Sequence, residues 1–235
     1  MCGICGIIGS SNPGTLEAMT DAIAHRGPDA DGFYQQDDVS LGHRRLSIVD
    51  VQHGQQPMTD ENGVVVVFNG EIYNFQELRA ELQARRHQFV SRSDTEVLLH
   101  GYAEWGSAVV SKLNGMFALA IWDTVAKTLF LARDRYGIKP LYIAAMEGVL
   151  FFASEVKAFF PHPAFRSSVD TAGLIEYFTF QNYFSDRTLY ENVSMFPAGH
   201  HVTVDGRSGG QWDRHLKSYW DYHFRTPKNP SGSRE

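Results

Sequence analysis

The sequence is poor in cysteine, in long apolar runs and in basic clusters, and each of these absences excludes a class of protein. Its 235 residues include only two cysteines, too few to close a structural zinc site, and no metal site is expected. No apolar run reaches the ~20 residues that a transmembrane helix requires, so we expect no membrane association. The net charge is −6 and no basic stripe is visible, which argues against a nucleic-acid partner.

The N-terminal segment, residues 1–14, lacks the basic start and the extended apolar core of a signal peptide. Without an export signal we expect a cytoplasmic protein, in which thiols stay reduced. Cys2 and Cys5 form a C-x-x-C pattern, which can mark a redox pair. The pair lies too close to the start of the sequence for the strand that precedes it in a thioredoxin-like unit.

Apolar periodicity predicts more strands than helices. Strands are predicted over residues 2–9, 32–35, 40–49, 64–68, 116–123, 128–134, 141–144, 149–153 and 199–204. Helices are predicted over residues 15–24, 75–82 and 171–178, and another is marked by apolar residues from 97 to 105. Because many of the strands read as adjacent hairpins, we predict an α+β protein with antiparallel sheets covered by helices, rather than a doubly wound parallel sheet.

Three local features refine this prediction. The apolar run over residues 64–68 suits a strand covered on both faces, and Asn69-Gly70 after it is a common turn signal. Ser93 and Asp94 are placed to cap the helix that follows them. The tail from about residue 226 is rich in Pro, Ser and Gly, so we expect it to be disordered.

Cys2 is the first residue whose side chain could act in catalysis. Initiator methionine is normally removed before a small residue such as cysteine, and its removal would leave a free α-amine beside the thiol. An α-amine has a reference pKa of ~7.7–8.0 and can act as the base that activates its own side chain. Taken alone, Cys2 is better interpreted as a small buried apolar residue near a chain end.

Further motifs, in a fixed order, decide between these two interpretations. They are MCGICGI at residues 1–7, HRGPD at 25–29, GHRRLSIVD at 42–50, QPM at 56–58, FNGEIYN at 68–74, SDTE at 93–96, GMFA at 115–118 and RDRYGIKPLY at 133–142. In this order they resemble the class II glutamine amidotransferases, an N-terminal-nucleophile (Ntn) family. RLSIVD is typical of its glutamine-hydrolysing asparagine synthetase branch, and the RWATHG-like segment of other branches is not found. The resemblance covers residues 2 to about 205.

The resemblance implies a fold and a domain division. The expected fold is a four-layer α/β/β/α sandwich with two antiparallel sheets. The glutaminase domain would comprise residues 2–205, and residues 206–235 would be a linker toward a missing synthetase domain. No SGGxDS loop is present, so ATP and Mg are expected only in that domain, and no cofactor in this chain. We expect either an excised part of a longer synthetase, which the tail favours, or a stand-alone subunit; a homodimer is possible in this family.

The resemblance also implies the catalytic groups. Cys2 would be the nucleophile, and Asn69 and Gly70 would form the oxyanion hole, since donors aimed at a developing oxyanion lower the barrier to amide hydrolysis. The alternative for these two residues is a plain Asn-Gly turn. His25 is not required by this mechanism and is expected to be structural.

A clamp for the α-carboxylate and α-ammonium of L-glutamine is implied as well. Arg45 aligns with the carboxylate-binding arginine of the family, and its neighbour Arg44 would face the opposite side of a strand. Asp94 is the expected partner of the ammonium, with Glu71 beside it, although Asp94 could also be only a helix cap. Backbone groups near Ile48 and Val49 are expected to complete the site.

The leading hypothesis is hydrolysis of L-glutamine to L-glutamate and ammonia through a Cys2 thioester, with the ammonia passed to a synthetase domain or subunit. The final acceptor, aspartate or another carboxylate, stays open. One alternative is an Ntn hydrolase of a different amide. Another is a regulatory or interaction domain that keeps the fold and has lost the activity, although such domains usually lose the nucleophile or the Asn-Gly-Glu segment.

Overall fold

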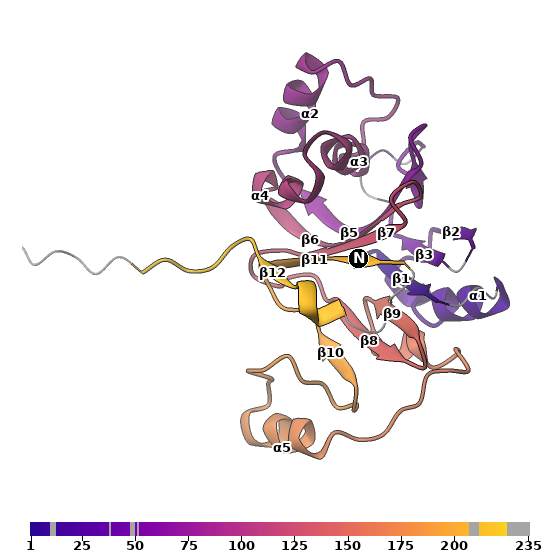
Figure 1. The fold of residues 1–235 in the computed structure, drawn as a ribbon, viewed down its shortest axis with the longest axis vertical. Helices are drawn as coiled ribbons and strands as arrows, with labels where there is room; N and C mark the ends of the chain where they lie inside the picture. Colours follow the sequence, from indigo (N-terminus) through magenta and orange to yellow (C-terminus); the bar gives the residue numbers. More distant parts are fainter. Residues whose placement is uncertain (10–12, 38, 48–49, 51, 207–211, 225–235) are drawn as a thin grey trace, which may run out of the picture.

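The computed structural model describes residues 1–9, 13–37, 39–47, 50, 52–206 and 212–224 (Figure 1). In this part of the chain two antiparallel sheets lie face to face. The first has the order β10-β8-β9-β1-β3-β2, with β1 Gly3–Ile8, β2 Ala30–Gln36, β3 Val39–Arg45, β8 Tyr142–Met146, β9 Val149–Ala153 and β10 Val193–Met195. The second has the order β12-β11-β7-β6-β5-β4, with β4 Met58–Thr59, β5 Val64–Ile72, β6 Gly115–Asp123, β7 Thr128–Arg133, β11 His200–Asp205 and β12 Lys217–Ser218.

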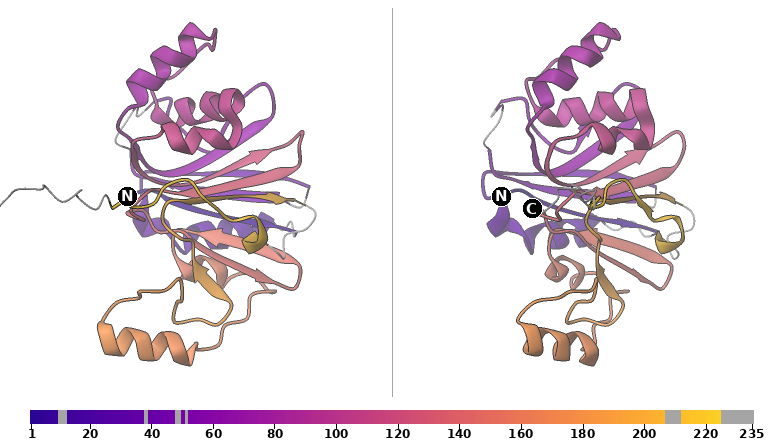
Figure 2. Two further views of the ribbon diagram at one scale, coloured as in Figure 1. Left: turned by 60° about the vertical axis from the view of Figure 1, so that its left-hand side comes forward. Right: turned by 90° about the vertical axis from the view of Figure 1, so that its left-hand side faces the viewer.

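Helices cover the outer faces of both sheets (Figures 1 and 2). The first sheet carries α1 Pro13–Asp21 and the short helices η1 Ala24–Arg26 and η3 Val156–Phe159. The second sheet carries α2 Phe75–Ala84, α3 Asp94–Trp105, η2 Gly106–Ala108 and α4 Val109–Lys112. Two further helices, α5 Thr171–Phe180 and η4 Trp212–His215, lie outside these layers. The arrangement confirms the predicted four-layer α+β sandwich.

Strand β5 shows how alternating side chains fill two cores at once. Val65 and Val67 pack between the two sheets, together with Ile4 of β1. Val64 and Val66 point the other way and pack beneath α2 and α3. Because successive side chains of a strand point to opposite faces, an unbroken apolar run is required here, as the sequence predicts.

The predicted turn at Asn69-Gly70 is wrong. Strand β5 runs through both residues to Ile72 and stays paired with β6, Asn69 opposite Ala118 and Gly70 opposite Phe117. Gly70 is required by close approach and not by a turn, because a Cβ there would lie 2.1 Å from the Met116 carbonyl oxygen. In contrast, the strand predicted over 40–49 ends earlier, at Arg45.

The other predicted strands and helices are confirmed with small shifts at their ends. Ser93 is the N-cap of α3, its Oγ accepting a hydrogen bond from Thr95 N at 3.0 Å, and Asp94 is the first helical residue. No helix among the described residues is long and apolar enough to cross a bilayer.

The chain continues to pack beyond residue 205. Strand β12 pairs with β11, and Trp212 and Leu216 pack against the core between the sheets. The domain boundary at 205 and the linker over 206–235 stay predictions, and the disorder predicted from about residue 226 lies outside the described residues.

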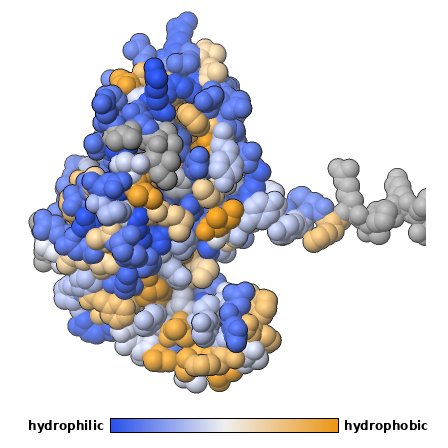
Figure 3. Space-filling view, turned by 180° about the vertical axis from the view of Figure 1, so that it is seen from behind, coloured by the Kyte–Doolittle hydropathy of each residue, from blue (hydrophilic) through white to orange (hydrophobic). Residues whose placement is uncertain are grey.

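Helix α5 leaves an apolar surface uncovered. Figure 3 shows apolar side chains gathered on the lobe that α5 forms. The exposed large side chains of this lobe are Ile175, Tyr177, Phe178, Phe180 and Phe184. Contiguous exposed apolar surface of this kind is typical of a contact with another polypeptide.

His43 on β3 is the most strongly perturbed histidine of the core. It is 1% exposed, and neither ring nitrogen has a hydrogen-bond partner among the described residues. Burial lowers the pKa of His43 from 6.5 to about 3; the Phe68 backbone opposes this shift and the Arg45 charge adds to it. The folded protein therefore holds His43 as the neutral imidazole.

We expect this burial to make the fold sensitive to acid. The unfolded chain protonates His43 below pH 6.5, whereas the folded chain resists protonation down to about pH 3, so stability is lost progressively over that window. Between pH 7 and pH 5 this residue should lower the free energy of unfolding by about 2 kcal/mol. In urea titrations at both pH values, His43→Leu should lack this loss and the exposed-site control His53→Leu should keep it. Equal pH dependence in wild type and His43→Leu would contradict the prediction.

Candidate active site

The predicted site residues meet in one cavity of ≈ 160 Å³, between β1, β3, β5 and the start of α3. Those that line it are Cys2, Arg45, Asn69, Gly70, Glu71 and Asp94. The remaining two, Ile48 and Val49, lie outside the described residues. A larger groove of ≈ 960 Å³, lined by His53, His87 and His100 among others, contains none of the predicted residues.

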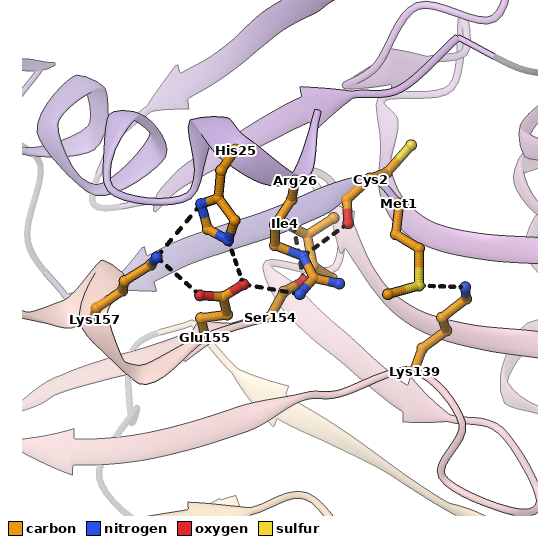
Figure 4. A network of polar contacts seen from close by, with 9 residues as sticks. All are labelled: Met1, Cys2, Ile4, His25, Arg26, Lys139, Ser154, Glu155 and Lys157. Atoms are coloured by element: carbon orange, nitrogen blue, oxygen red, sulfur yellow. Dashed lines mark hydrogen bonds and ion pairs between the residues drawn. The ribbon is translucent and has the colours of Figure 1, made fainter. Parts of the chain in front are cut away.

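Cys2 directly precedes β1 and is held there by hydrogen bonds to both its side chain and its main chain. Its Sγ accepts a hydrogen bond from Leu46 N at 3.4 Å and lies 3.6 Å from Leu46 O. Its carbonyl oxygen accepts a hydrogen bond from Arg26 Nε at 3.1 Å (Figure 4). Arg26 is in turn fixed by Glu155, with Nη1 2.9 Å from Oε1. Arg26 thus has the structural role that the resemblance implies for the segment containing His25 and Arg26.

Cys5 differs from Cys2 in burial. It is fully buried on β1, with its Sγ 3.4 Å from Thr20 Oγ1. Burial raises the pKa of the Cys5 thiol to about 12, although the Thr20 hydrogen bond and the Arg44 charge oppose the shift. Because the thiolate is the reactive form, Cys5 is inert in the folded protein.

The edge of β5 that faces the cavity carries a row of backbone donors. Strand β4 pairs only with Val65 and Val66, so the edge beyond them has no strand partner among the described residues. Phe68 N instead donates to Gln56 Oε1 at 2.6 Å, and Ile72 N donates to Asp94 Oδ2 at 3.0 Å.

Gly70 lies between these two donors and directs its N–H to the same edge, since backbone groups alternate along a strand. The partner residue across the sheet agrees with this. Phe117 donates its N–H to Asp134 Oδ2 and accepts from Asp134 N, so both of its backbone groups face away from Gly70. The Gly70 N–H is therefore available at the cavity.

Asn69 supplies a second unused group. Its side chain is 1% exposed, and neither the amide oxygen nor the amide nitrogen has a hydrogen-bond partner among the described residues. A buried amide without a partner costs about 1–3 kcal/mol, so such groups are rare outside functional sites. The Asn69 amide and the Gly70 N–H line the same cavity as the Cys2 thiol.

Arg44 and Arg45 separate to opposite sides of β3. Arg45 is 5% exposed, lines the cavity, and donates from Nη2 to Asp50 O at 2.7 Å. Arg44 forms ion pairs with Asp21 of α1 and with Asp31 of β2. Of the two guanidinium groups, only that of Arg45 lines the cavity.

Two carboxylates face the same cavity. Asp94 is largely buried, and this burial raises the pKa of its carboxyl group; the Glu71 charge adds to the effect, while backbone donors led by Ile72 N oppose it. Glu71 is exposed at its rim. A cavity with one guanidinium and two carboxylates offers complementary charges to a zwitterionic amino acid. No group of three or more His, Cys, Asp or Glu side chains in the described part of the chain could hold a metal ion.

His25 is not part of the cavity. It is half exposed and its Nε2 lies 2.9 Å from Glu155 Oε1, in the cluster that also holds Arg26 and Lys157 (Figure 4). Lys139, in contrast, does line the cavity and is 4% exposed, although the sequence analysis gave it no role.

The fold is that of the Ntn hydrolases. Glutamine phosphoribosylpyrophosphate amidotransferase from B. subtilis matches it with a TM-score of 0.67 and 20% identity, over 92% of this chain and 48% of that one. Similarity at this identity shows the fold alone. The glutamine amidotransferase domain family matches residues 1–220, and the chain belongs to this family of enzymes.

Curated relatives confirm the predicted branch of the family. Asparagine synthetase [glutamine-hydrolyzing] 3 of Bacillus subtilis is 43% identical over 186 residues, which cover 76% of this chain and 30% of that protein. Asparagine synthetase [glutamine-hydrolyzing] 2 of the same organism is 37% identical over 233 residues, 94% of this chain and 30% of the relative. The chain thus spans about 30% of the length of these two relatives.

The two cysteines should differ sharply toward a general thiol reagent. We expect iodoacetamide at pH 8 to alkylate Cys2 in the folded protein and to leave Cys5 unmodified, because Cys5 is fully buried with a pKa of about 12. In urea both should react. Peptide mass spectrometry measures the two sites separately, and comparable native rates at Cys2 and Cys5 would contradict this prediction.

Proposed function

We propose that this domain hydrolyses L-glutamine to L-glutamate and ammonia through a γ-glutamyl thioester on Cys2, after removal of Met1. The observation that carries the proposal is the buried amide of Asn69, which has no hydrogen-bond partner among the described residues, in a residue that lines the same cavity as Cys2. A buried donor without a protein partner is what an oxyanion formed only during the reaction requires.

In the proposed reaction the Cys2 α-amine carries the proton between the thiol, the leaving nitrogen and water. The α-amine of Cys2 takes the thiol proton as Sγ attacks the amide carbon of glutamine, and the carbonyl oxygen becomes an oxyanion between the Asn69 amide and the Gly70 N–H. The α-ammonium then gives that proton to the leaving nitrogen, which departs as ammonia and leaves the thioester. Water, deprotonated by the same amine, attacks the thioester and releases glutamate and the free thiol.

The charged side chains of the cavity would orient the amino-acid end of the substrate. Arg45 would bind the α-carboxylate, while Asp94 and Glu71 would bind the α-ammonium. Ile72 N donates to Asp94 Oδ2, which fixes the direction of the carboxylate, and a carboxylate has further lone pairs with which to accept from a ligand. Ile48 and Val49 are proposed to contribute backbone groups, as the resemblance implies.

We further propose that the ammonia is used by a synthetase domain or subunit that binds ATP and Mg and amidates aspartate or another carboxylate. Two findings support this. The matched relatives are named glutamine-hydrolysing asparagine synthetases and are about three times as long as this match. The uncovered apolar side chains of α5 offer a surface for another polypeptide, a second copy of this chain in a homodimer being the alternative.

Replacing the nucleophile is the direct test. Cys2→Ala should abolish release of glutamate and ammonia from glutamine, because no thioester can form. A glutamine-like electrophile such as 6-diazo-5-oxonorleucine should add mass at Cys2 of the wild-type chain and none at Cys5. Glutaminase activity retained in Cys2→Ala would refute the proposed function, and intact mass should show that the active chain lacks Met1.

Asn69→Leu should separate catalysis from stability. Since the Asn69 amide has no partner among the described residues, an apolar side chain of similar volume should leave the free energy of unfolding unchanged or raise it. Loss of one oxyanion donor should lower kcat by about 10²–10³. Urea denaturation and a coupled glutamate assay measure the two effects. A variant that is destabilised with kcat intact would assign Asn69 a structural role instead.

A further inference from the structure

Lys139 is a buried cation beside the chain start that the proposed chemistry leaves unused. It follows β7 in a tightly organised loop, where its N–H donates to Asp134 Oδ2 at 3.0 Å and its carbonyl oxygen accepts from Arg133 Nε at 2.7 Å. The main chain of Lys139 is thus fixed on both sides by buried residues. Its side chain lines the cavity and is 4% exposed.

The direction of this side chain is informative. Lys139 Nζ lies 3.2 Å from Met1 Sδ, and the Cys2 thiol points away from it (Figure 4). Met1, Cys2 and Lys139 line the same cavity, so the ammonium of Lys139 lies on the side from which the start of the chain is approached. In the part of the chain that is described, Lys139 forms no ion pair with a carboxylate, whereas the neighbouring cation Arg26 is compensated by Glu155.

We propose that the ammonium of Lys139 is a positioning group for the mature N-terminus, keeping the α-amine of Cys2 in its free-base form at neutral pH. This inference rests on the proposed function for its purpose, and its physical basis is repulsion between like charges. A nearby cation disfavours protonation of the amine, and at a separation of ~7 Å in a partly buried site this repulsion corresponds to roughly one pH unit.

The consequence for catalysis is that a larger fraction of the enzyme has an unprotonated α-amine, which can act as the base. With a reference pKa of ~7.7–8.0, only roughly one α-amine in eight is unprotonated at pH 7; lowering this pKa by roughly one unit brings the fraction to about a half.

Other charged groups surround the Cys2 α-amine and Lys139 and also influence the pKa values of both. They are Arg26 from η1, Arg45 from β3, Glu71 from β5, Asp94 from α3 and Asp134 at the end of β7. Burial lowers the pKa of Lys139 itself and the Arg26 charge adds to this; the charges of Cys2, Asp134 and Glu71 act in the opposite direction. Lys139 exerts this repulsion only while it carries its proton, so a neutral Lys139 would give the same α-amine midpoint in wild type and in Lys139→Met.

The α-amine can be observed without any enzymatic assay, because the chain has only two cysteines. In protein labelled with ¹⁵N-cysteine and shown by intact mass to lack Met1, the Cys2 α-amine gives one signal and the Cys5 amide the other. We expect the titration midpoint of the α-amine to rise by roughly one pH unit in Lys139→Met and to stay at the wild-type value in Lys139→Arg. Lys139→Gln serves as a second neutral variant should the methionine variant fold poorly.

The matched control is Lys157→Met, which removes an exposed lysine paired with Glu155 outside the cavity and should leave the midpoint unchanged. The acidic limb of the kcat/KM profile for glutamine should move with the midpoint, so that Lys139→Met loses activity at pH 7 and recovers it near pH 9. An unmoved midpoint in both neutral variants, or an equal shift in Lys157→Met, would overturn the inference. If the midpoint rises in Lys139→Met but the wild-type chain hydrolyses no glutamine, only the proposed function is overturned.

Discussion

The site depends on one constraint, the unpaired edge of β5. Strand β4 ends after two pairs, while β5 continues to Ile72, so backbone donors beyond Phe68 need acceptors from elsewhere. Gln56 and Asp94 satisfy two of them from the segments that wall the cavity. The donor between them, at Gly70, and the buried amide of Asn69 are left for a ligand, which makes this edge the candidate oxyanion site.

The first sheet brings the nucleophile to that edge. Strand β1 is central in its sheet, paired with β3 and β9, so the start of the chain is held rather than frayed. The carbonyl of Cys2 is bonded to Arg26 and its thiol to Leu46 N, which together limit where the thiol can point. Asp134 accepts hydrogen bonds from Phe117 N and Lys139 N, so one buried carboxylate connects β6 with the loop that carries Lys139.

Much of this could be predicted from the sequence. The two-sided strand over residues 64–68, the cap at Ser93 and the paired hairpins follow from local patterns, and the structure confirms them. The identity of the site residues followed from resemblance alone, because Asn69 and Arg45 carry no local sign of function. The turn at Asn69-Gly70 was wrong because the propensity for a turn is local, whereas the pairing with β6 and the close contact to Met116 O are not.

The sequence by itself determined which segments form strands and helices, and through its ordered motifs the family and the set of candidate residues. Only the tertiary structure decided how these residues face one another. Arg45 faces the cavity and Arg44 the Asp21 carboxylate, Asn69 has no side-chain partner in the described part of the chain, and Lys139 lies beside the chain start. The physical reason is separation along the chain. Lys139 meets Met1 across 138 residues and Arg26 meets Cys2 across 24, and no local periodicity encodes contacts of that range.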